Sequence, residues 1–224
     1  MLLALDSVSL YYDDKPVIDQ LSLSINQGEK LAIVGASGAG KSTLLTHIFH
    51  QLESDAALCS QSQGLVENLS IFHNIYMGAL CRHGWPYNLA NLVWPFKRHL
   101  AEVKTLCDLL ELPVALNTRV SALSGGQRQR VAIARAIYQQ KNTFLGDEAF
   151  SALDPVMASR LLEYVLAQHT SVVMVLHDCR LALGHFDRVV GLKQGKVALN
   201  QLACELNEQM LSEFFDNQFV EAVS

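Results

Sequence analysis

The sequence of 224 residues is long enough for one sizeable α/β domain, and half of its residues are apolar, which allows a substantial core. Its net charge of −5 and its dispersed acidic residues argue against a nucleic-acid partner. Five widely spaced cysteines without a C-x-x-C pair argue against a disulfide framework or a zinc site and indicate reduced thiols. No apolar run approaches the length of a membrane span, so we expect any membrane association to come through another protein.

The first third of the chain predicts strands followed by a helix. Residues 2–10 and 20–25 alternate between apolar and polar, which predicts two strands joined by a turn at 13–16. The apolar run 31–34 predicts a buried strand, and a glycine-rich loop and a helix beginning at Lys41 follow it. A strand, loop and helix in this order predict the opening unit of a parallel α/β sheet.

The remaining elements continue this alternation. Residues 68–112 have the apolar spacing of helices, interrupted at Gly84 and Pro86. The further predictions are, in chain order, strands at 56–59, 143–145 and 171–176, helices at 127–140 and 161–168, a hairpin of 189–192 with 196–199, and an amphipathic helix at 205–215.

Residues 35–42 carry the first chemical motif, G-A-S-G-A-G-K-S, which fits the pattern G-x-x-x-x-G-K-[ST] between a strand and a helix. The glycines allow backbone N–H groups to close around phosphate oxygens, and the helix N-terminus adds a favourable dipole. We expect Lys41 to reach the terminal phosphates and Ser42 to hold Mg²⁺. A plain glycine turn is the alternative, disfavoured because every fixed position is occupied. The predicted nucleotide ligands are Gly35, Ser37, Gly38, Ala39, Gly40, Lys41, Ser42 and Thr43.

Residues 123–127, L-S-G-G-Q, precede an apolar helix and form a second helix start suited to a phosphate. This is the signature sequence of the ATP-binding-cassette (ABC) family, which the chain resembles over almost its whole length. The resemblance implies an ATP-hydrolysing subunit of a membrane transporter. It implies a P-loop NTPase core with a mostly parallel sheet, a reduced antiparallel β-subdomain and an inserted α-helical arm. It also implies that Ser124, Gly125, Gly126 and Gln127 contact ATP held by the opposite subunit of a dimer.

Residues 144–148, F-L-G-D-E, resemble the Walker B strand of the family. The resemblance assigns Asp147 to Mg²⁺ and makes Glu148 the general base that orients and deprotonates the attacking water. Taken alone, the acidic pair could instead cap the next segment. Asp154 ends a stretch S-A-L-D that matches the D-loop, which crosses the dimer interface. Ala149 replaces the usual proline, which implies a looser turn and slower catalysis.

Three further positions complete the expected ATP site. His177 follows an apolar strand and matches the switch histidine that contacts the γ-phosphate, although a lone histidine there is often structural. Gln61 matches the Q-loop glutamine, which would sense Mg²⁺ and the nucleophilic water; Gln63 is the alternative. Tyr12 is the first candidate for stacking on adenine and Tyr11 the second, because adjacent strand residues face opposite sides. A core or edge role for either tyrosine is an equal alternative.

The chain departs from the family pattern between Lys41 and Gln61, which are only 20 positions apart. The family usually places a longer segment there, which supplies antiparallel strands beside the base. We therefore expect a thin base pocket. A non-catalytic or degenerate regulatory cassette is the alternative function, and two-cassette soluble proteins are disfavoured by the length of the chain.

Weaker resemblances point to the ATPases of phosphonate and related oxyanion importers. They lie in residues 64–70, 74–78, 181–192 and 205–215. The implied partners are integral-membrane permease subunits, a second copy of the chain and, indirectly, a substrate-binding protein, with no nucleic acid. The implied location is the cytoplasmic face of the inner membrane.

The expected organisation is a single nucleotide-binding domain over residues 1–224. Residues 1–61 and 123–224 would form the ATP-binding core and residues 62–122 the helical subdomain. In that arm, four large aromatic residues are candidates either for a permease docking groove or for the arm's own core. They are Trp85, Tyr87, Trp94 and Phe96.

Overall fold

The structure is a computed structural model that describes residues 1–12, 14–52, 54–60 and 64–221, with side chains up to residue 215. Contacts divide the chain into two compact units. The sheet unit comprises residues 1–58, 142–148 and 163–224, and the helical unit comprises residues 59–141 and 149–162. Within the described ranges, no helix combines the length and the apolar character needed to cross a membrane.

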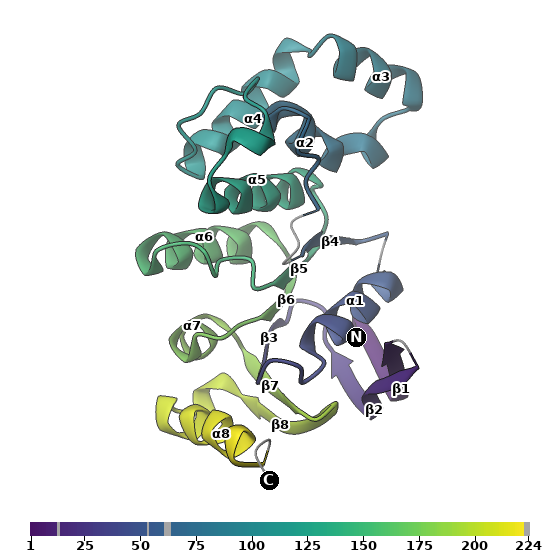
Figure 1. The fold of residues 1–224 in the computed structure, drawn as a ribbon. Helices are drawn as coiled ribbons and strands as arrows, with labels where there is room; N and C mark the ends of the chain where they lie inside the picture. Colours follow the sequence, from purple (N-terminus) through teal and green to yellow (C-terminus); the bar gives the residue numbers. More distant parts are fainter. Residues whose placement is uncertain (13, 53, 61–63, 222–224) are drawn as a thin grey trace. The chain divides into compact units, whose positions relative to one another are not determined.

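A six-stranded sheet with the order β4-β5-β6-β3-β7-β8 organises the sheet unit (Figure 1). Strand β3 pairs in parallel with β6 and β7, β5 pairs in parallel with β6, and β8 pairs antiparallel with β7. The bounds are Lys30–Gly35 for β3, Ala56–Cys59 for β4, Thr143–Asp147 for β5, Ser171–Val175 for β6, Arg188–Lys193 for β7 and Lys196–Leu202 for β8. The predicted mostly parallel sheet is confirmed.

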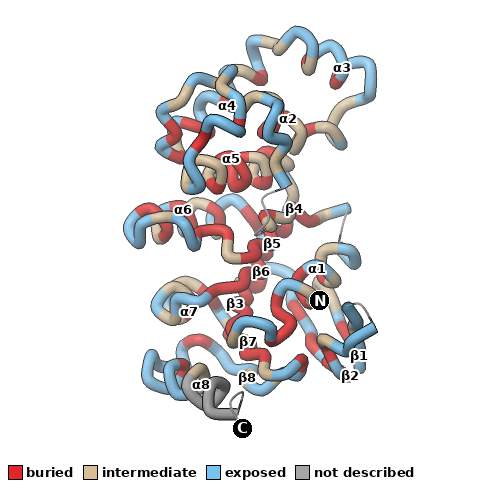
Figure 2. The backbone as a smooth tube through the Cα atoms, viewed as in Figure 1, coloured by how far each residue is buried: buried red, intermediate tan, exposed pale blue. Residues whose placement is uncertain are grey.

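Burial explains why the central strands could be recognised. Every residue of β5 and β6 is buried, and Figure 2 shows the buried residues concentrated along the central strands. Parallel strands that helices cover on both faces require such continuous apolar runs. In Figure 1, α1 (Lys41–Leu52) covers one face, while α7 (Cys179–His185) and α8 (Glu208–Glu221) cover the other.

Strands β1 (Leu3–Tyr12) and β2 (Lys15–Ile25) form a separate two-stranded antiparallel sheet. The predicted reduced antiparallel β-subdomain is therefore confirmed. The prediction that the second strand begins at residue 20 is wrong, because Tyr12 already pairs with Lys15 and Pro16 pairs with Tyr11. Proline is tolerated here because β2 is an edge strand.

The helical unit includes residues 64–122, within the predicted helical subdomain, and extends beyond them to residues 123–141 and 149–162. Its elements follow in chain order. They are α2 (Ile71–Tyr76), the 3₁₀ helices η1 (Met77–Arg82) and η2 (Val120–Ala122), α3 (Trp85–Val93), α4 (Lys97–Leu109), α5 (Gly125–Tyr138) and the first half of α6 (Pro155–Gln168). Two predicted helix starts are wrong by part of a turn or more. Helix α5 begins two residues early because Ser124 caps it, and α6 begins at Pro155 instead of residue 161 because Asp154 caps it.

The tail differs in a similar way from its predicted helix at 205–215. Residues Ala203–Glu205 form the 3₁₀ helix η3, and α8 begins at Glu208. The Asn207 side chain accepts a hydrogen bond from the Met210 N–H at 2.9 Å, which fixes this later start. Phe214 of α8 packs against Gly191 of β7, where a Cβ would lie 2.5 Å from the ring. A glycine is therefore needed for α8 to approach the sheet.

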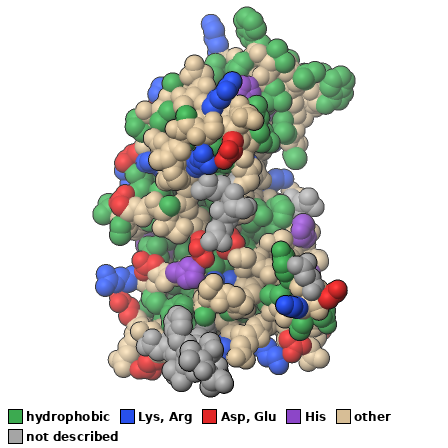
Figure 3. All heavy atoms as spheres, viewed as in Figure 1, with side chains coloured by type: hydrophobic (Ala, Val, Ile, Leu, Met, Phe, Trp, Pro, Cys, Tyr) green, Lys and Arg blue, Asp and Glu red, His purple; other side chains and the backbone are tan. Residues whose placement is uncertain are grey.

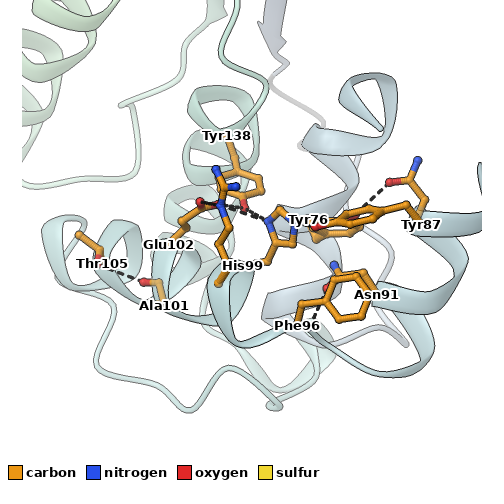
Figure 4. A network of polar contacts seen from close by, with 11 residues as sticks. Tyr76, Tyr87, Asn91, Phe96, His99, Ala101, Glu102, Thr105 and Tyr138 are labelled. Atoms are coloured by element: carbon orange, nitrogen blue, oxygen red, sulfur yellow. Dashed lines mark hydrogen bonds and ion pairs between the residues drawn. The ribbon is translucent and has the colours of Figure 1, made fainter. Parts of the chain in front are cut away.

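A buried polar network fastens the end of α5 to α3 and α4 (Figure 4). His99 is 2% exposed, and its Nδ1 lies 2.8 Å from the Tyr138 hydroxyl while its Nε2 lies 2.9 Å from the Tyr87 hydroxyl. Tyr138 donates a hydrogen bond of 2.6 Å to Glu102, and burial raises the pKa of the Tyr138 phenol well above its usual value. The interior of this unit is thus held by hydrogen bonds as well as by apolar packing.

Candidate functional site

The loop 35–40 between β3 and α1 needs glycine at three positions. Gly38 and Gly40 have φ angles of 80° and 96°, a region that disfavours residues with a Cβ. A Cβ on Gly40 would lie 2.7 Å from Ile18 Cδ1, and one on Gly35 would lie 2.5 Å from the Leu192 carbonyl oxygen. Packing and backbone conformation together therefore fix the curl of this loop.

Lys41 lies buried inside the curl, with 6% of its surface exposed. Its Nζ donates hydrogen bonds to the carbonyl oxygens of Gly35 at 2.8 Å and Ala36 at 2.9 Å. Burial lowers the pKa of Lys41, and the nearby carboxylates of Glu148 and Asp147 oppose that shift. A desolvated cation next to loop N–H groups is suited to bind a terminal phosphate.

Asp147, at the end of β5, provides a place for a cation. It is 7% exposed, and burial raises its pKa while a hydrogen bond from Ser42 opposes that shift. Among the residues that the structure describes, its Oδ1 atom has no hydrogen-bond partner. A buried carboxylate oxygen without a partner is costly, and a hydroxyl with one carboxylate is a typical protein contribution to a Mg²⁺ site. Ser42 and Asp147 therefore fit the predicted ion.

Glu148 and His177 meet at the same edge of the sheet. His177 Nε2 lies 2.6 Å from Glu148 Oε1. Asp147 pairs with Val175 across β5 and β6, so the residues that follow these two parallel strands emerge together. Glu148 has a φ angle of 53°, an unfavourable conformation for a residue with a side chain and one that clusters at functional sites. Ala149, which follows, is buried.

The signature residues lie in the helical unit. Ser124 caps α5 by accepting a hydrogen bond from the Gln127 N–H at 3.3 Å, and Gln127 Oε1 accepts one from the Ser124 N–H at 2.9 Å. Ser124 and Gly125 are exposed. Asp154 Oδ1 accepts a hydrogen bond from the Met157 N–H at 3.0 Å and so caps α6. The reciprocal capping box of Ser124 and Gln127 therefore forms an exposed start of α5.

The structure thus places the predicted site residues in two groups. Gly35, Lys41, Ser42, Asp147, Glu148 and His177 lie in the sheet unit, together with Ser37, Gly38, Ala39, Gly40 and Thr43. Ser124, Gly125, Gly126, Gln127 and Asp154 lie in the helical unit. The predicted Gln61 and its alternative Gln63 lie outside the described residues. Tyr12 and Tyr11 are 69% and 65% exposed at the end of β1, so both side chains are accessible to a base.

The four arm aromatics fall into two pairs. The rings of Tyr87 and Phe96 pack edge to face with centroids 5.0 Å apart, inside the helical unit. Trp85 and Trp94 are 77% and 79% exposed, and Figure 3 shows hydrophobic side chains gathered over α3. The two tryptophans are available to a partner, whereas Tyr87 and Phe96 pack on each other at the surface of the arm, where Tyr87 is still 38% exposed.

Sequence reasoning missed one functional candidate, Gln129. It is 6% exposed on α5, and its Oε1 accepts a hydrogen bond of 2.9 Å from the N–H of Ala152 in the predicted D-loop. The two residues are 23 positions apart, so only the fold reveals this contact. The available signal was a glutamine inside the otherwise apolar face of a helix.

Comparisons with known proteins agree with this geometry. The family described as ABC transporter matches residues 18–151. The chain is 32% identical to the phosphonates import ATP-binding protein PhnC 1 of Pseudomonas syringae pv. syringae (97% of this chain, 93% of the relative). It is 34% identical to the phosphonates import ATP-binding protein PhnC of Pseudomonas putida (94% and 88%). The 248-residue alignment with the first relative is longer than this chain, so that relative carries residues without a counterpart here.

Solved structures show the same fold. The dimeric structure of a bacterial ABC transporter cassette superposes with a TM-score of 0.77 at 23% identity, covering 89% of this chain and 98% of that one. The predicted fold class and the family resemblance are both confirmed.

Proposed function

The chain is an ATPase of the ABC transporter family, and we propose that it drives the import of phosphonate-type oxyanions through membrane permease subunits at the cytoplasmic face of the membrane. The names of the relatives support the substrate class, because both are phosphonate import ATP-binding proteins. The substrate itself would contact the permease and a substrate-binding protein. This chain would supply the energy.

One observation carries the proposal: Lys41, Asp147, Glu148 and His177 converge at the carboxyl edge of the parallel sheet. Open α/β sheets bind their ligands at this edge. Lys41 would contact the terminal phosphates, and Glu148 would orient the attacking water and accept its proton. The 2.6 Å contact with His177 would aim the Glu148 carboxylate before ATP arrives. Mg²⁺ held by Ser42 and Asp147 would neutralise charge on the phosphates.

We place the complementary half of each site on a second copy of the chain. The Ser124 helix start is exposed and has a suitable dipole for a phosphate, yet it belongs to the helical unit and not to the phosphate loop. Two copies facing each other would complete two sites at once, as a symmetric dimer requires. ATP binding would then close the dimer, and hydrolysis would reopen it.

The exposed face of α3 is the part of the arm that we assign to the permease. Trp85, Leu89 and Val93 follow each other at intervals of four residues and are 77%, 54% and 75% exposed, with Trp94 beside them. Residues at this spacing share one face of a helix. Exposed aromatic and aliphatic side chains of this kind are typical of interface cores.

Hydrolysis by the purified chain tests the enzymatic half of the proposal. Mg²⁺-dependent ATP hydrolysis should rise more than linearly with protein concentration, because the active species is a dimer. The Glu148→Gln variant should bind ATP equally well and hydrolyse it about 100-fold more slowly, within the range that general-base catalysis contributes. ATP binding without hydrolysis, even with the permease present, would instead support the non-catalytic regulatory cassette.

Growth of the source organism tests the transport half. Loss of this chain should abolish growth on an alkylphosphonate as the only phosphorus source and leave growth on inorganic phosphate unchanged. Restoring the wild-type chain should rescue growth, whereas restoring Glu148→Gln should not. Unimpaired growth on the phosphonate would overturn the substrate assignment and leave the ATPase assignment intact.

A further inference from the structure

The predicted D-loop, residues 151–154, is an exposed turn before α6. Ser151, Ala152 and Asp154 are all exposed. The turn contains a hydrogen bond of 3.1 Å from the Leu153 N–H to the Phe150 carbonyl, and Asp154 caps α6. An exposed turn of this kind is held more firmly where another element contacts it.

Gln129 supplies that contact from the signature helix. Its side chain is 6% exposed, and its Oε1 accepts a hydrogen bond of 2.9 Å from the Ala152 N–H. The same turn also approaches the signature glycines, since a Cβ on Gly126 would lie 3.4 Å from the Ala152 carbonyl oxygen. Both backbone groups of Ala152 therefore face α5: its N–H donates to Gln129, and its carbonyl oxygen lies near Gly126.

We propose that Gln129 is a positioning residue that locks the D-loop to the signature sequence, so that both segments meet a second copy of the chain as one preformed surface. This inference rests on the proposed function, in which that surface covers the ATP of the partner. Gln129 would touch neither ATP nor the reacting atoms. Gln129 would affect hydrolysis by fixing the positions of residues 124–126 and 151–154 relative to one another.

The chemistry of the side chain allows the hydrogen bond to be separated from packing. Gln129→Glu keeps an acceptor oxygen at the same reach, although it buries a carboxylate, which carries a desolvation cost. Gln129→Met keeps the length and volume and loses the acceptor. If the hydrogen bond positions the D-loop, activity should decrease from wild type to the Glu variant and then to the Met variant. A residue that only fills space predicts that the Met variant is at least as active as the Glu variant.

The experiment is steady-state ATP hydrolysis at saturating protein concentration, with KM and kcat measured separately. We expect Gln129→Met to lower kcat about fivefold, the factor that a single neutral hydrogen bond is worth, with KM for ATP unchanged. The Glu variant should recover part of that loss. Gln168→Met, an exposed glutamine at the end of α6, is the matched control and should equal wild type.

A second variant, at the donor end of the same hydrogen bond, keeps the test valid if the Gln129 variants fail to fold. Ala152→Pro removes the donor N–H without changing any residue of α5, and should lower kcat at least as much. Melting temperatures and ATP binding are measured for every variant. Wild-type kcat for Gln129→Met, or a Glu variant no better than the Met variant, would overturn the inference while leaving the proposed function standing. Absence of hydrolysis by the wild type would instead count against the proposed function.

Discussion

Two helix starts in this chain are suited to a phosphate, and they are built differently. The start of α1 is enclosed by a loop with left-handed glycines, and the buried Lys41 lies within it. The start of α5 is exposed, and its cap is made by its own Ser124 and Gln127. Both offer backbone N–H groups and a helix dipole. The first start also brings the buried Lys41 and the carboxylate of Asp147, whereas the charged side chain in the first turn of α5, Arg128, is paired with Glu67.

The difference shows how one chain can carry two unequal halves of a site. The first start has buried charge that a bound nucleotide and its cation would compensate, so it can select a ligand by itself. The second start is held without a ligand by its capping box, which satisfies the N–H groups of Ser124 and Gln127. The N–H groups of the two glycines between them are the ones that we assign to a phosphate. The second start is therefore already folded and exposed before it meets a phosphate bound to another copy.

The largest expected effect comes from removing the cation of the first start. Lys41→Ala should lower hydrolysis about 1,000-fold, because it removes a buried charge that would stabilise the phosphates in the transition state. ATP affinity, measured by equilibrium binding, should fall as well. Normal hydrolysis by this variant would mean that the first start is not the nucleotide site.

A charge placed at the second start should stop hydrolysis without harming the fold. A Cβ at Gly125 would meet no atom within 4 Å, and an acidic side chain is favourable at a helix N-terminus. Gly125→Asp should therefore retain the wild-type melting temperature and ATP affinity. Repulsion of the partner's phosphate should reduce hydrolysis about 100-fold, a cost similar to that of losing one oxyanion donor.

The neutral variant Gly125→Asn is the control for size. It should retain much more activity than the Asp variant, because it adds the same volume without the charge. Equal losses in the two variants would indicate a steric effect and would leave the proposed phosphate contact unsupported.

A smaller effect is expected where the base would bind. Tyr12→Ala should raise KM for ATP about fivefold, the lower end of the stacking energy for an exposed ring on a base. Tyr11→Ala should leave KM unchanged, because adjacent strand residues face opposite sides. The reverse pattern would move the base contact to Tyr11.

The smallest effect concerns stability without nucleotide. Burial raises the pKa of Asp147 in the folded state above its value in the unfolded state. Ionisation of Asp147 therefore destabilises the fold at a pH above the raised pKa, and this cost is absent at a pH below the unfolded-state pKa. Asp147→Asn should therefore raise the melting temperature at neutral pH by about 2 °C. The gain should vanish in acid, and thermal melts at several pH values check this. A gain that does not depend on pH would contradict the electrostatic origin.

Much of the sheet could be predicted because its signals are local. Strands β3, β5 and β6 are short apolar runs, and the hairpin of β7 and β8 turns at Gly195, which has a φ angle of 76°. The start of β2 was missed because Pro16 suggested a longer turn, although Tyr12 pairs with Lys15 only three positions away. The start of α6 was missed because Asp154 was assigned to the D-loop motif and not considered as the cap of a helix.

The site shows the same division between local and long-range information. The phosphate loop and the signature sequence are contiguous, so their residues could be named from the sequence. The contacts of Glu148 with His177 and of Gln129 with Ala152 join residues 29 and 23 positions apart and depend on the fold. The burial that shifts the pKa of Lys41 and Asp147 likewise arises only once the sheet has formed.

If the start of α5 in one copy covers the ATP of another, a hydrolysis-deficient chain should associate only when ATP is bound. Light scattering with size exclusion would compare Glu148→Gln with the double variant Glu148→Gln, Gly125→Asp, each with and without ATP. We predict that Glu148→Gln becomes a dimer only with ATP, while the double variant binds ATP and stays monomeric. An ATP-dependent dimer of the double variant would show that the start of α5 does not contact the partner's ATP.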